Sequence, residues 1–179
     1  MLYWLSYVMA EGSSQADMAK EAPQEKHTDN IECAVCLQPC IHPAQLPCGH
    51  IFCFLCVKGI ANQSKRCAMC RQEIPRDFIE HPKLLHGPEA VEGFDGGYQW
   101  FYEGRNGWWQ YDPRTNEDIE EAFKLNYSQF QILICGETYV IDFENKVQYP
   151  KKNPSRKRFI KRDTSDNIAN FKGIAGINK

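Results

Sequence analysis

The densest group of chemically capable side chains in this 179-residue sequence is a set of cysteines with one histidine among them. Nine cysteines are present, and eight of them fall between Cys33 and Cys70. Zinc prefers four thiolate or imidazole ligands in a tetrahedron, and a Cys-x2-Cys turn directs two sulfur atoms at one point. Eight ligands predict two structural zinc sites, and the candidates are Cys33, Cys36, Cys48, His50, Cys53, Cys56, Cys67 and Cys70.

The cysteine count also bears on the compartment and on the chemistry. An odd number of cysteines in this spacing is a poor disulfide framework and indicates thiolates held on metal in a reducing compartment. Each site would have four protein ligands, so no position is left for a metal-bound water and zinc hydrolysis is not expected. Cys40 and Cys135 fall outside the pattern, and we interpret them as a spare loop thiol and a buried strand residue. No residue is predicted to act as a general base or a nucleophile.

The ligand spacing resembles that of the RING finger. His50 is the fourth ligand, whereas the related PHD finger has its histidine at the fifth. The resemblance implies a cross-brace, in which one zinc ion is bound by Cys33, Cys36, Cys53 and Cys56 and the other by Cys48, His50, Cys67 and Cys70. It also implies that the domain binds a ubiquitin-conjugating enzyme charged with ubiquitin, and that the chemistry takes place on this partner.

The same resemblance implies a docking surface for the conjugating enzyme. Val35, Leu37 and Pro75 match its apolar positions, although Val35 and Leu37 are also explained by support of the zinc loop. Arg71 follows the last ligand and implies a bridge to ubiquitin, for which the fixed fork of arginine donors is suited. Asn62 departs from the pattern, because many RING fingers have a tryptophan there in the docking groove. This departure favours the alternative of a non-catalytic adaptor.

From Tyr98 onward the composition changes to short runs of aromatic and β-branched residues. These runs predict strands at Tyr98–Glu103, Gly107–Tyr111, Phe130–Cys135, Thr138–Phe143 and Lys146–Tyr149. A helix between the second and third runs is capped by Thr115 or Asn116 and has an apolar stripe of Ile119, Ala122 and Phe123. The predicted fold class is therefore α+β, with a small zinc finger followed by a curved antiparallel sheet around one helix.

The run from Trp100 to Tyr111 has more aromatic residues than a short hairpin core needs, and it resembles the WWE domain. That family is named for two tryptophans and a glutamate. Trp100 and Trp109 match the tryptophans, and either Glu103 or Glu117 matches the glutamate.

A RING finger followed by a WWE domain is similar to the Iduna-type family of poly(ADP-ribose)-dependent ubiquitin ligases. The segments that carry this likeness are Pro47–Val57, Lys65–Pro75, Tyr102–Asp112 and Val147–Tyr149. The expected organisation is a disordered segment over 1–30, a RING finger over 31–80, a linker over 81–86, a WWE domain over 87–163 and a tail over 164–179.

A unit of poly(ADP-ribose) offers an adenine, ribose hydroxyl groups and two phosphates. Its recognition calls for an aromatic face, amide or hydroxyl groups, and cations. The resemblance implies a pocket built from Tyr102, Arg105, Trp109, Tyr139, Gln148 and Arg158, with Lys172 beyond the module and Lys58 from the RING finger. Gln148 can donate to and accept from a base edge, and Arg158 can bind a phosphate with two donors. Trp109 is equally explained as a core residue, and Arg158 as a solvated charge.

The net charge of −2 conceals an asymmetry, because residues 81–149 carry −7 and residues 150–179 carry +7. The basic end indicates a polyanionic partner or a nuclear localisation signal. A nucleic-acid-binding zinc protein is one alternative, and the acidic balance of 81–149 weighs against it. No apolar run approaches the ~18–20 residues that cross a bilayer. The first ten residues lack the positive charge of a signal peptide, so no membrane association is expected.

The resemblance implies a function for the two domains together. The expectation is a zinc-dependent ubiquitin ligase that binds poly(ADP-ribosyl)ated proteins and promotes their ubiquitination and proteasomal degradation. The implied partners are a charged ubiquitin-conjugating enzyme and modified proteins that include tankyrases and their substrates. The implied setting is the cytosol and nucleus, with a link to Wnt signalling.

Overall fold

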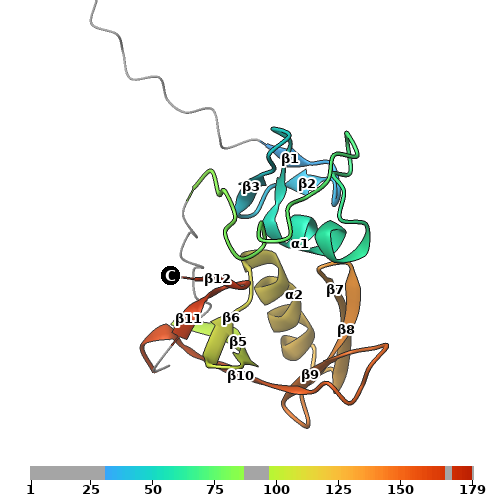
Figure 1. Cartoon of the computed structure of the whole chain (residues 1–179). Helices are drawn as coiled ribbons and strands as arrows, with labels where there is room; N and C mark the ends of the chain where they lie inside the picture. Colours follow the sequence, from blue (N-terminus) through green and yellow to red (C-terminus); the bar gives the residue numbers. More distant parts are fainter. Residues whose placement is uncertain (1–30, 87–96, 168–170, 179) are drawn as a thin grey trace, which may run out of the picture.

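The computed structural model describes residues 31–86, 97–167 and 171–178. The expected disordered segment over 1–30 and the first ten residues of the expected WWE domain lie outside the described residues. Figure 1 shows two halves, with the zinc-finger half in blue to green above the second half in yellow to red. Among the helices of the described part, none is long and apolar enough to cross a membrane.

The first half is built from very short elements. β1 (Glu32–Cys33) pairs with β2 (Gln38–Pro39), β3 (Pro43–Gln45) pairs with β4 (Ile51–Cys53), and α1 (Phe54–Gln63) follows β4 directly. Its core is small, with Phe52, Phe54 and Val57 almost fully buried. Strands of two or three residues and so few apolar side chains do not form a stable domain unaided. Metal binding is therefore needed to hold this half together.

Part of the expected linker over 81–86 packs along the first half. Gln45 N donates to Lys83 O at 2.9 Å, and Leu85 N donates to Pro43 O at 2.9 Å. Leu84 forms an isolated antiparallel bridge with Ala44 and packs against the core. These residues therefore belong to the zinc-finger half, which continues past residue 80, where the sequence analysis expects it to end.

The second half is one curved eight-stranded sheet with a helix in its concavity (Figure 1). Its strands are β5 (Tyr98–Gly104), β6 (Gly107–Gln110), β7 (Gln129–Ile134), β8 (Glu137–Asp142), β9 (Val147–Pro150), β10 (Arg158–Thr164), β11 (Phe171–Ile174) and β12 (Ile177–Asn178). The order is β12-β11-β6-β5-β10-β9-β8-β7, and α2 (Pro113–Lys124) is the helix. A short 3-10 helix, η2 (Ser165–Asn167), follows β10. The predicted α+β class is confirmed.

The five predicted strands correspond to β5 to β9 within one residue at each end. The strands β10, β11 and β12 were not among the predictions, because their residues are basic or glycine-containing and lack an apolar alternation. The sequence predicts that the second domain ends at residue 163, yet the sheet continues through the expected tail. β11 pairs in parallel with β6, and Ile177 of β12 packs into the core of the zinc-finger half.

Helix α2 begins earlier than the sequence analysis expects. Its N-cap is Asp112, whose side chain accepts from Thr115 N at 3.3 Å, and Pro113 occupies the first turn. The predicted caps, Thr115 and Asn116, are wrong, since both are buried inside the helix. An aspartate followed by a proline is a strong helix start because it supplies an acceptor and a preset φ. Phe123, expected in the apolar stripe, is 43% exposed at the edge of the core.

A buried ion pair joins the helix to the sheet. Trp100 Nε1 donates to Glu120 at 2.9 Å, and Arg162 donates to both carboxylate oxygens of Glu120, each at 2.9 Å. Burial opposes ionisation, but the hydrogen bonds from Arg162 and Trp100 hold the pKa of Glu120 below its usual range. Glu103 and Glu117, the two candidates for the family's glutamate, are both exposed, whereas the buried glutamate bound to Trp100 is Glu120.

Candidate metal centres and ligand pocket

Within residues 31–86, 97–167 and 171–178, two groups of side chains could hold a metal ion. The ligand atoms of each group lie within 4.8 Å of one another. The first group is Cys33, Cys36, Cys53 and Cys56, and the second is Cys48, His50, Cys67 and Cys70. These are the two interleaved sets of a cross-brace, which confirms that part of the predicted fold.

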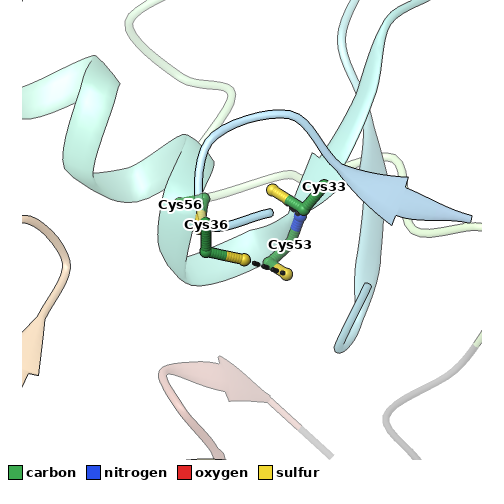
Figure 2. Close-up of side chains that lie close together, drawn as sticks. All are labelled: Cys33, Cys36, Cys53 and Cys56. Atoms are coloured by element: carbon green, nitrogen blue, oxygen red, sulfur yellow. Dashed lines mark hydrogen bonds between the residues drawn. The ribbon is translucent and has the colours of Figure 1, made fainter. Parts of the chain in front are cut away.

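The first cluster has the geometry of a zinc site. Figure 2 shows its four cysteines, which come from β1, the loop after it, β4 and the first turn of α1. Cys36 Sγ and Cys53 Sγ are 3.8 Å apart. A tetrahedral ion with metal–sulfur bonds of ~2.3 Å places its sulfur atoms about 3.8 Å apart. The four thiolates therefore fit a structural zinc ion.

The second cluster combines thiolates with an imidazole. His50 Nδ1 lies 3.4 Å from Cys48 Sγ and 3.6 Å from Cys67 Sγ, so Nδ1 is the atom that faces the metal position. Cys40, which the sequence leaves outside both sites, also lies outside both clusters. Burial raises the pKa of the Cys40 thiol to about 11. The interpretation of Cys135 as a buried strand residue is wrong, because Cys135 is half-buried in the turn between β7 and β8.

The backbone shapes two of the three Cys-x2-Cys turns in the same way. Leu37 and Arg71 follow a ligand directly and adopt left-handed φ angles of 57° and 66°. Leu37 N donates to Cys33 O at 2.7 Å, and Arg71 N donates to Cys67 O at 3.0 Å. Each turn is thus closed by a backbone bond that directs its two sulfur atoms inward.

The residues predicted to dock a conjugating enzyme are available at the surface. Leu37 is 80% exposed and Val35 is 38% exposed, and Arg71 and Pro75 are also exposed. Met69, beside the last ligand, is 58% exposed and was not predicted. Exposed apolar side chains on zinc loops are more consistent with contact to a partner than with support of the loops alone.

Four of the residues predicted to bind poly(ADP-ribose) come together on one face of the sheet. In the strand register, Arg158 on β10 pairs directly with Gln148 on β9. Cross-strand partners and residues two apart on one strand share a face. Ile160 lies two residues after Arg158 on β10 and pairs with Tyr102, so Tyr102 lies on the same face. Ile141 of β8 pairs with Gln148, and Tyr139 lies two residues before Ile141, so Tyr139 lies on this face as well.

These four side chains line a cavity of about 190 Å³ between the two halves of the molecule. Helix α1 contributes Leu55, Lys58 and Asn62, and the remaining walls are Tyr111, Asp112, Ile134, Cys135, Glu137 and Ala175. The three α1 residues are three and four positions apart, which places them on one side of the helix. Asn62, considered for the docking groove in the sequence, therefore lines the ligand cavity.

Two buried polar atoms at the cavity have no partner among the described residues. Gln148 is 4% exposed and its Oε1 has no hydrogen-bond donor; Tyr111 is 3% exposed and its hydroxyl is likewise unpaired. Such atoms are rare in folded proteins and are usually paired with a water molecule or a ligand. Burial raises the pKa of both Tyr111 and Tyr102, so these phenols are neutral donors at the cavity.

Lys58 and the four residues on the sheet are thus five of the eight residues predicted to bind poly(ADP-ribose), and the other three lie elsewhere. Arg105, Trp109 and Lys172 line a separate open cavity of about 260 Å³ together with Asn106 and Asn178. Trp109 is the cross-strand partner of Tyr102, but its indole lies against Gly104 at the end of the hairpin. The single pocket implied by the resemblance is thus divided in this structure. Tyr111 is one of the lining residues that sequence reasoning missed, although it is the last residue of a predicted strand.

Comparisons with known proteins agree with this division into two domains. The family model described as a zinc finger of C3HC4 type (RING finger) matches residues 29–76, and the WWE domain matches residues 98–162. The chain is 55% identical over 150 residues to the E3 ubiquitin-protein ligase rnf146 of Salmo salar, covering 82% of this chain and 42% of that protein. It is 53% identical over 148 residues to the E3 ubiquitin-protein ligase RNF146 of Homo sapiens, covering 82% and 41%.

The E3 ubiquitin-protein ligase RNF146-A of Bos taurus gives a similar result, with 53% identity over 148 residues. The chain spans less than half the length of the curated relatives that it matches. The two domain matches, the zinc-binding clusters and the order of the domains show that the chain belongs to the proteins that carry a RING finger followed by a WWE domain, and over these domains it is similar to the ligases named RNF146.

Proposed function

We propose that this chain is a RING-type ubiquitin ligase that recognises poly(ADP-ribosyl)ated proteins through its WWE domain. The RING finger would orient a ubiquitin-conjugating enzyme charged with ubiquitin, and a substrate lysine would attack the thioester on that enzyme. Both zinc sites are closed by four protein ligands, so their role is structural. The proposal rests on one observation above all, which is the convergence of aromatic, amide and cationic side chains on one cavity with unpaired polar atoms.

The chemistry of the cavity suits an adenosine-containing anion. Gln148 offers a free carbonyl oxygen for an adenine amino group, and the neutral phenols of Tyr102 and Tyr139 supply ring faces and donors. Arg158 can bind a phosphate with two parallel donors. A cavity of about 190 Å³ is below the ~300–1,000 Å³ of sites that enclose drug-sized ligands, so it would enclose part of a polymer unit and leave the rest at its mouth.

Both domains would contribute to this recognition. Lys58 and Asn62 reach the cavity from helix α1 of the RING finger, so a bound phosphate could be held from both sides. A ligand that contacts two domains stabilises the arrangement in which both contacts are made, by the difference in its affinity for the two arrangements. Polymer binding is therefore proposed to favour one orientation of the RING finger.

The first test measures polymer binding by calorimetry with iso-ADP-ribose. Arg158→Ala should weaken binding by about 1–3 kcal/mol, which is the range for a hydrogen bond to a charged group, while the protein retains two zinc ions. Arg156→Ala, which removes an exposed arginine that does not line the cavity and acts on Tyr139 only through its charge, is the matched control and should lose clearly less affinity than Arg158→Ala. Unchanged affinity in the Arg158 variant would remove this residue from the site.

The second test measures ubiquitin transfer in a purified system with a panel of conjugating enzymes, with and without iso-ADP-ribose. Arg71→Ala should lower transfer and leave iso-ADP-ribose affinity unchanged, because Arg71 lies on the second zinc loop. Polymer binding by the wild-type chain without ubiquitin transfer from any conjugating enzyme would support the adaptor alternative instead.

We also propose the partners and setting that follow from this activity. Poly(ADP-ribosyl)ated proteins, tankyrases among them, would be bound and marked for proteasomal degradation in the cytosol and nucleus, with a link to Wnt signalling. The first step is tested by incubating tankyrase with and without NAD⁺, the substrate for its modification, and measuring how much tankyrase this chain captures from each reaction. Capture that does not depend on the modification would contradict it.

A further inference from the structure

The contact between the two domains includes an arginine that reaches a zinc ligand. Arg114 lies in the first turn of α2, in the WWE domain, and is half-buried. Its Nη2 donates to Pro39 O of β2 at 3.0 Å, and its Nη1 lies 3.8 Å from Cys36 Sγ with hydrogen-bonding geometry. One guanidinium therefore binds both the carbonyl and the thiolate side of the first zinc loop.

The helix of Arg114 explains its position only in part, through the charge of Asp118 one turn further along. The first turn of a helix has a positive end, which disfavours a cation there. Cys36 belongs to a cluster of four thiolates, and such a cluster with one Zn²⁺ carries a formal charge of −2. A guanidinium beside it is therefore attracted to the sulfur atoms, and planar arginine donors suit two acceptors at once.

The first zinc cluster receives donors from both domains. From its own domain, Ile41 N donates to Cys53 Sγ at 3.3 Å and Cys53 N donates to Cys33 Sγ at 3.5 Å. Arg114 adds a side-chain donor from the WWE domain to Cys36. Groups that hydrogen-bond to metal ligands orient these ligands and raise metal affinity.

The reach of Arg114 depends on close docking of the two domains. Gly59 of α1 lies against the backbone of Cys135, where an added Cβ would be 2.9 Å from its carbonyl carbon. Gln63 Nε2 donates to Gly136 O at 3.1 Å beside this contact. The turn between β7 and β8 thus packs directly on α1, and this contact holds α2 next to the zinc loop.

We propose that Arg114 is an outer-shell donor to the zinc-bound thiolate of Cys36, so that the WWE domain helps to retain one of the two zinc ions of the RING finger. Arg114 is a positioning residue in this role. The cluster of Cys48, His50, Cys67 and Cys70 receives no such contact from Arg114 and serves as an internal reference within the same molecule. The proposal concerns zinc retention and does not depend on polymer binding.

The test measures zinc release from the full chain to a chromogenic chelator at neutral pH. In Arg114→Gln, one equivalent of zinc should be released at least about tenfold faster than in the wild type, which is the lower end of the effect of losing an outer-shell partner. The second equivalent should be released at the wild-type rate. Arg114→Lys should be intermediate, because an ammonium point charge cannot span both acceptors. The matched control, Arg156→Gln, removes an exposed arginine of the WWE domain and should release both ions as the wild type does.

Substitution of the zinc ions by ¹¹³Cd identifies the site that responds. The two clusters give separate resonances because one has four sulfur ligands and the other has three sulfur ligands and one nitrogen. The four-sulfur resonance should shift in Arg114→Gln and the other should not. Release at the wild-type rate, equal acceleration for both ions, or the same acceleration in Arg156→Gln would each overturn the proposal.

Discussion

At the scale of single residues, the ligand cavity is defined by polar atoms that the protein does not satisfy by itself. A buried acceptor without a donor costs free energy in the absence of ligand, because it has lost its bonds to water. Gln148 and Tyr111 both carry such an atom at the wall between the two domains. An arrangement that is unfavourable in the free protein becomes favourable when a ligand supplies the missing partner.

Gln148→Met tests this account, since methionine has a similar volume and no polar group. The variant should lose at least about tenfold in affinity for iso-ADP-ribose, since one hydrogen bond is worth about 1 kcal/mol and the partner group on the ligand would be left unpaired. The free protein should unfold at the same or a higher denaturant concentration than the wild type, because an unsatisfied buried acceptor has been removed. Chemical unfolding and calorimetry on the same sample give both values. A large loss of stability together with unchanged affinity would contradict the assignment.

At the scale of elements, α2 is attached to the sheet by a charged network rather than by apolar packing alone. Glu120 is 2% exposed and binds Trp100 of β5 and Arg162 of β10, so one carboxylate connects the helix to two neighbouring strands. Breaking a buried ion pair by removing one partner costs more than the pair contributes, because the other charge is left without compensation. The network therefore fixes how the helix lies in the concave face that carries the ligand residues.

The pH dependence of stability follows from the lowered pKa of Glu120. A carboxyl group whose pKa is lower in the folded state adds stability above its unfolded pKa of about 4.3, and this stability is lost as the pH falls through the folded pKa. Glu120→Gln should be less stable than the wild type by about 1–3 kcal/mol at pH 7, since Arg162 is partly solvated and its isolation costs less than a full burial would. The difference should shrink below pH 4. Urea unfolding followed by tryptophan fluorescence at a series of pH values measures it, and a constant difference down to pH 3 would contradict the network.

The elements that could be predicted from the sequence are those that depend on residues close together in the chain. The strands β5 to β9 alternate aromatic and β-branched residues between turn residues, and the zinc ligands have a fixed spacing, so both were predicted. The strand β10 was not predicted, because its basic residues give no local strand signal. Arg158 and Arg162 pair in the sheet with Gln148 and Trp100, which lie on other strands. Glu120 was missed for the same reason, since its partners become visible only when β5 and β10 lie side by side.

The division of the predicted ligand residues has a similar cause. Tyr102 and Trp109 are cross-strand partners, so their proximity follows from the hairpin. The direction in which each side chain leans depends on its neighbours, and the indole of Trp109 lies over Gly104, toward Arg105 and Lys172. The contribution of Tyr111 and Asn62 to the cavity depends on how two domains pack, which no local pattern encodes.

At the scale of the whole molecule, the ligand cavity exists because the two domains are docked. Its walls come from α1 on one side and from the five strands β5, β7, β8, β9 and β10 on the other, and Ile177 at the far end of the chain packs into the core of the RING finger. Lys58 also lies close to the C-terminal strands, since a Cβ on Gly176 would be 2.7 Å from its Nζ. The cavity should therefore be sensitive to substitutions that separate the domains without altering either one.

Gly59→Ala is such a substitution. Alanine favours the interior of helix α1 by up to about 1 kcal/mol over glycine, so the RING finger should stay folded with both zinc ions bound when no chelator is present, although the ion of the first cluster should be released faster once Arg114 is drawn away from Cys36. The added methyl group would meet the backbone of Cys135 at 2.9 Å, which forces the domains apart and moves Lys58 from the cavity. Calorimetry should give a clearly weaker affinity for iso-ADP-ribose with an unchanged zinc content. Wild-type affinity would mean that the RING finger does not contribute to the site.

The most direct test of the central claim compares iso-ADP-ribose with ADP-ribose by calorimetry on the full chain. Iso-ADP-ribose is the internal unit of the polymer, with its two riboses linked and a phosphate on each side, whereas ADP-ribose lacks this linkage. A cavity lined by Arg158 on one side and Lys58 on the other should bind one molecule of iso-ADP-ribose per chain. It should bind ADP-ribose at least about tenfold more weakly, because one charge-assisted hydrogen bond would be lost. Equal affinity for the two compounds, or binding of neither, would contradict the claim that this chain reads the polymer.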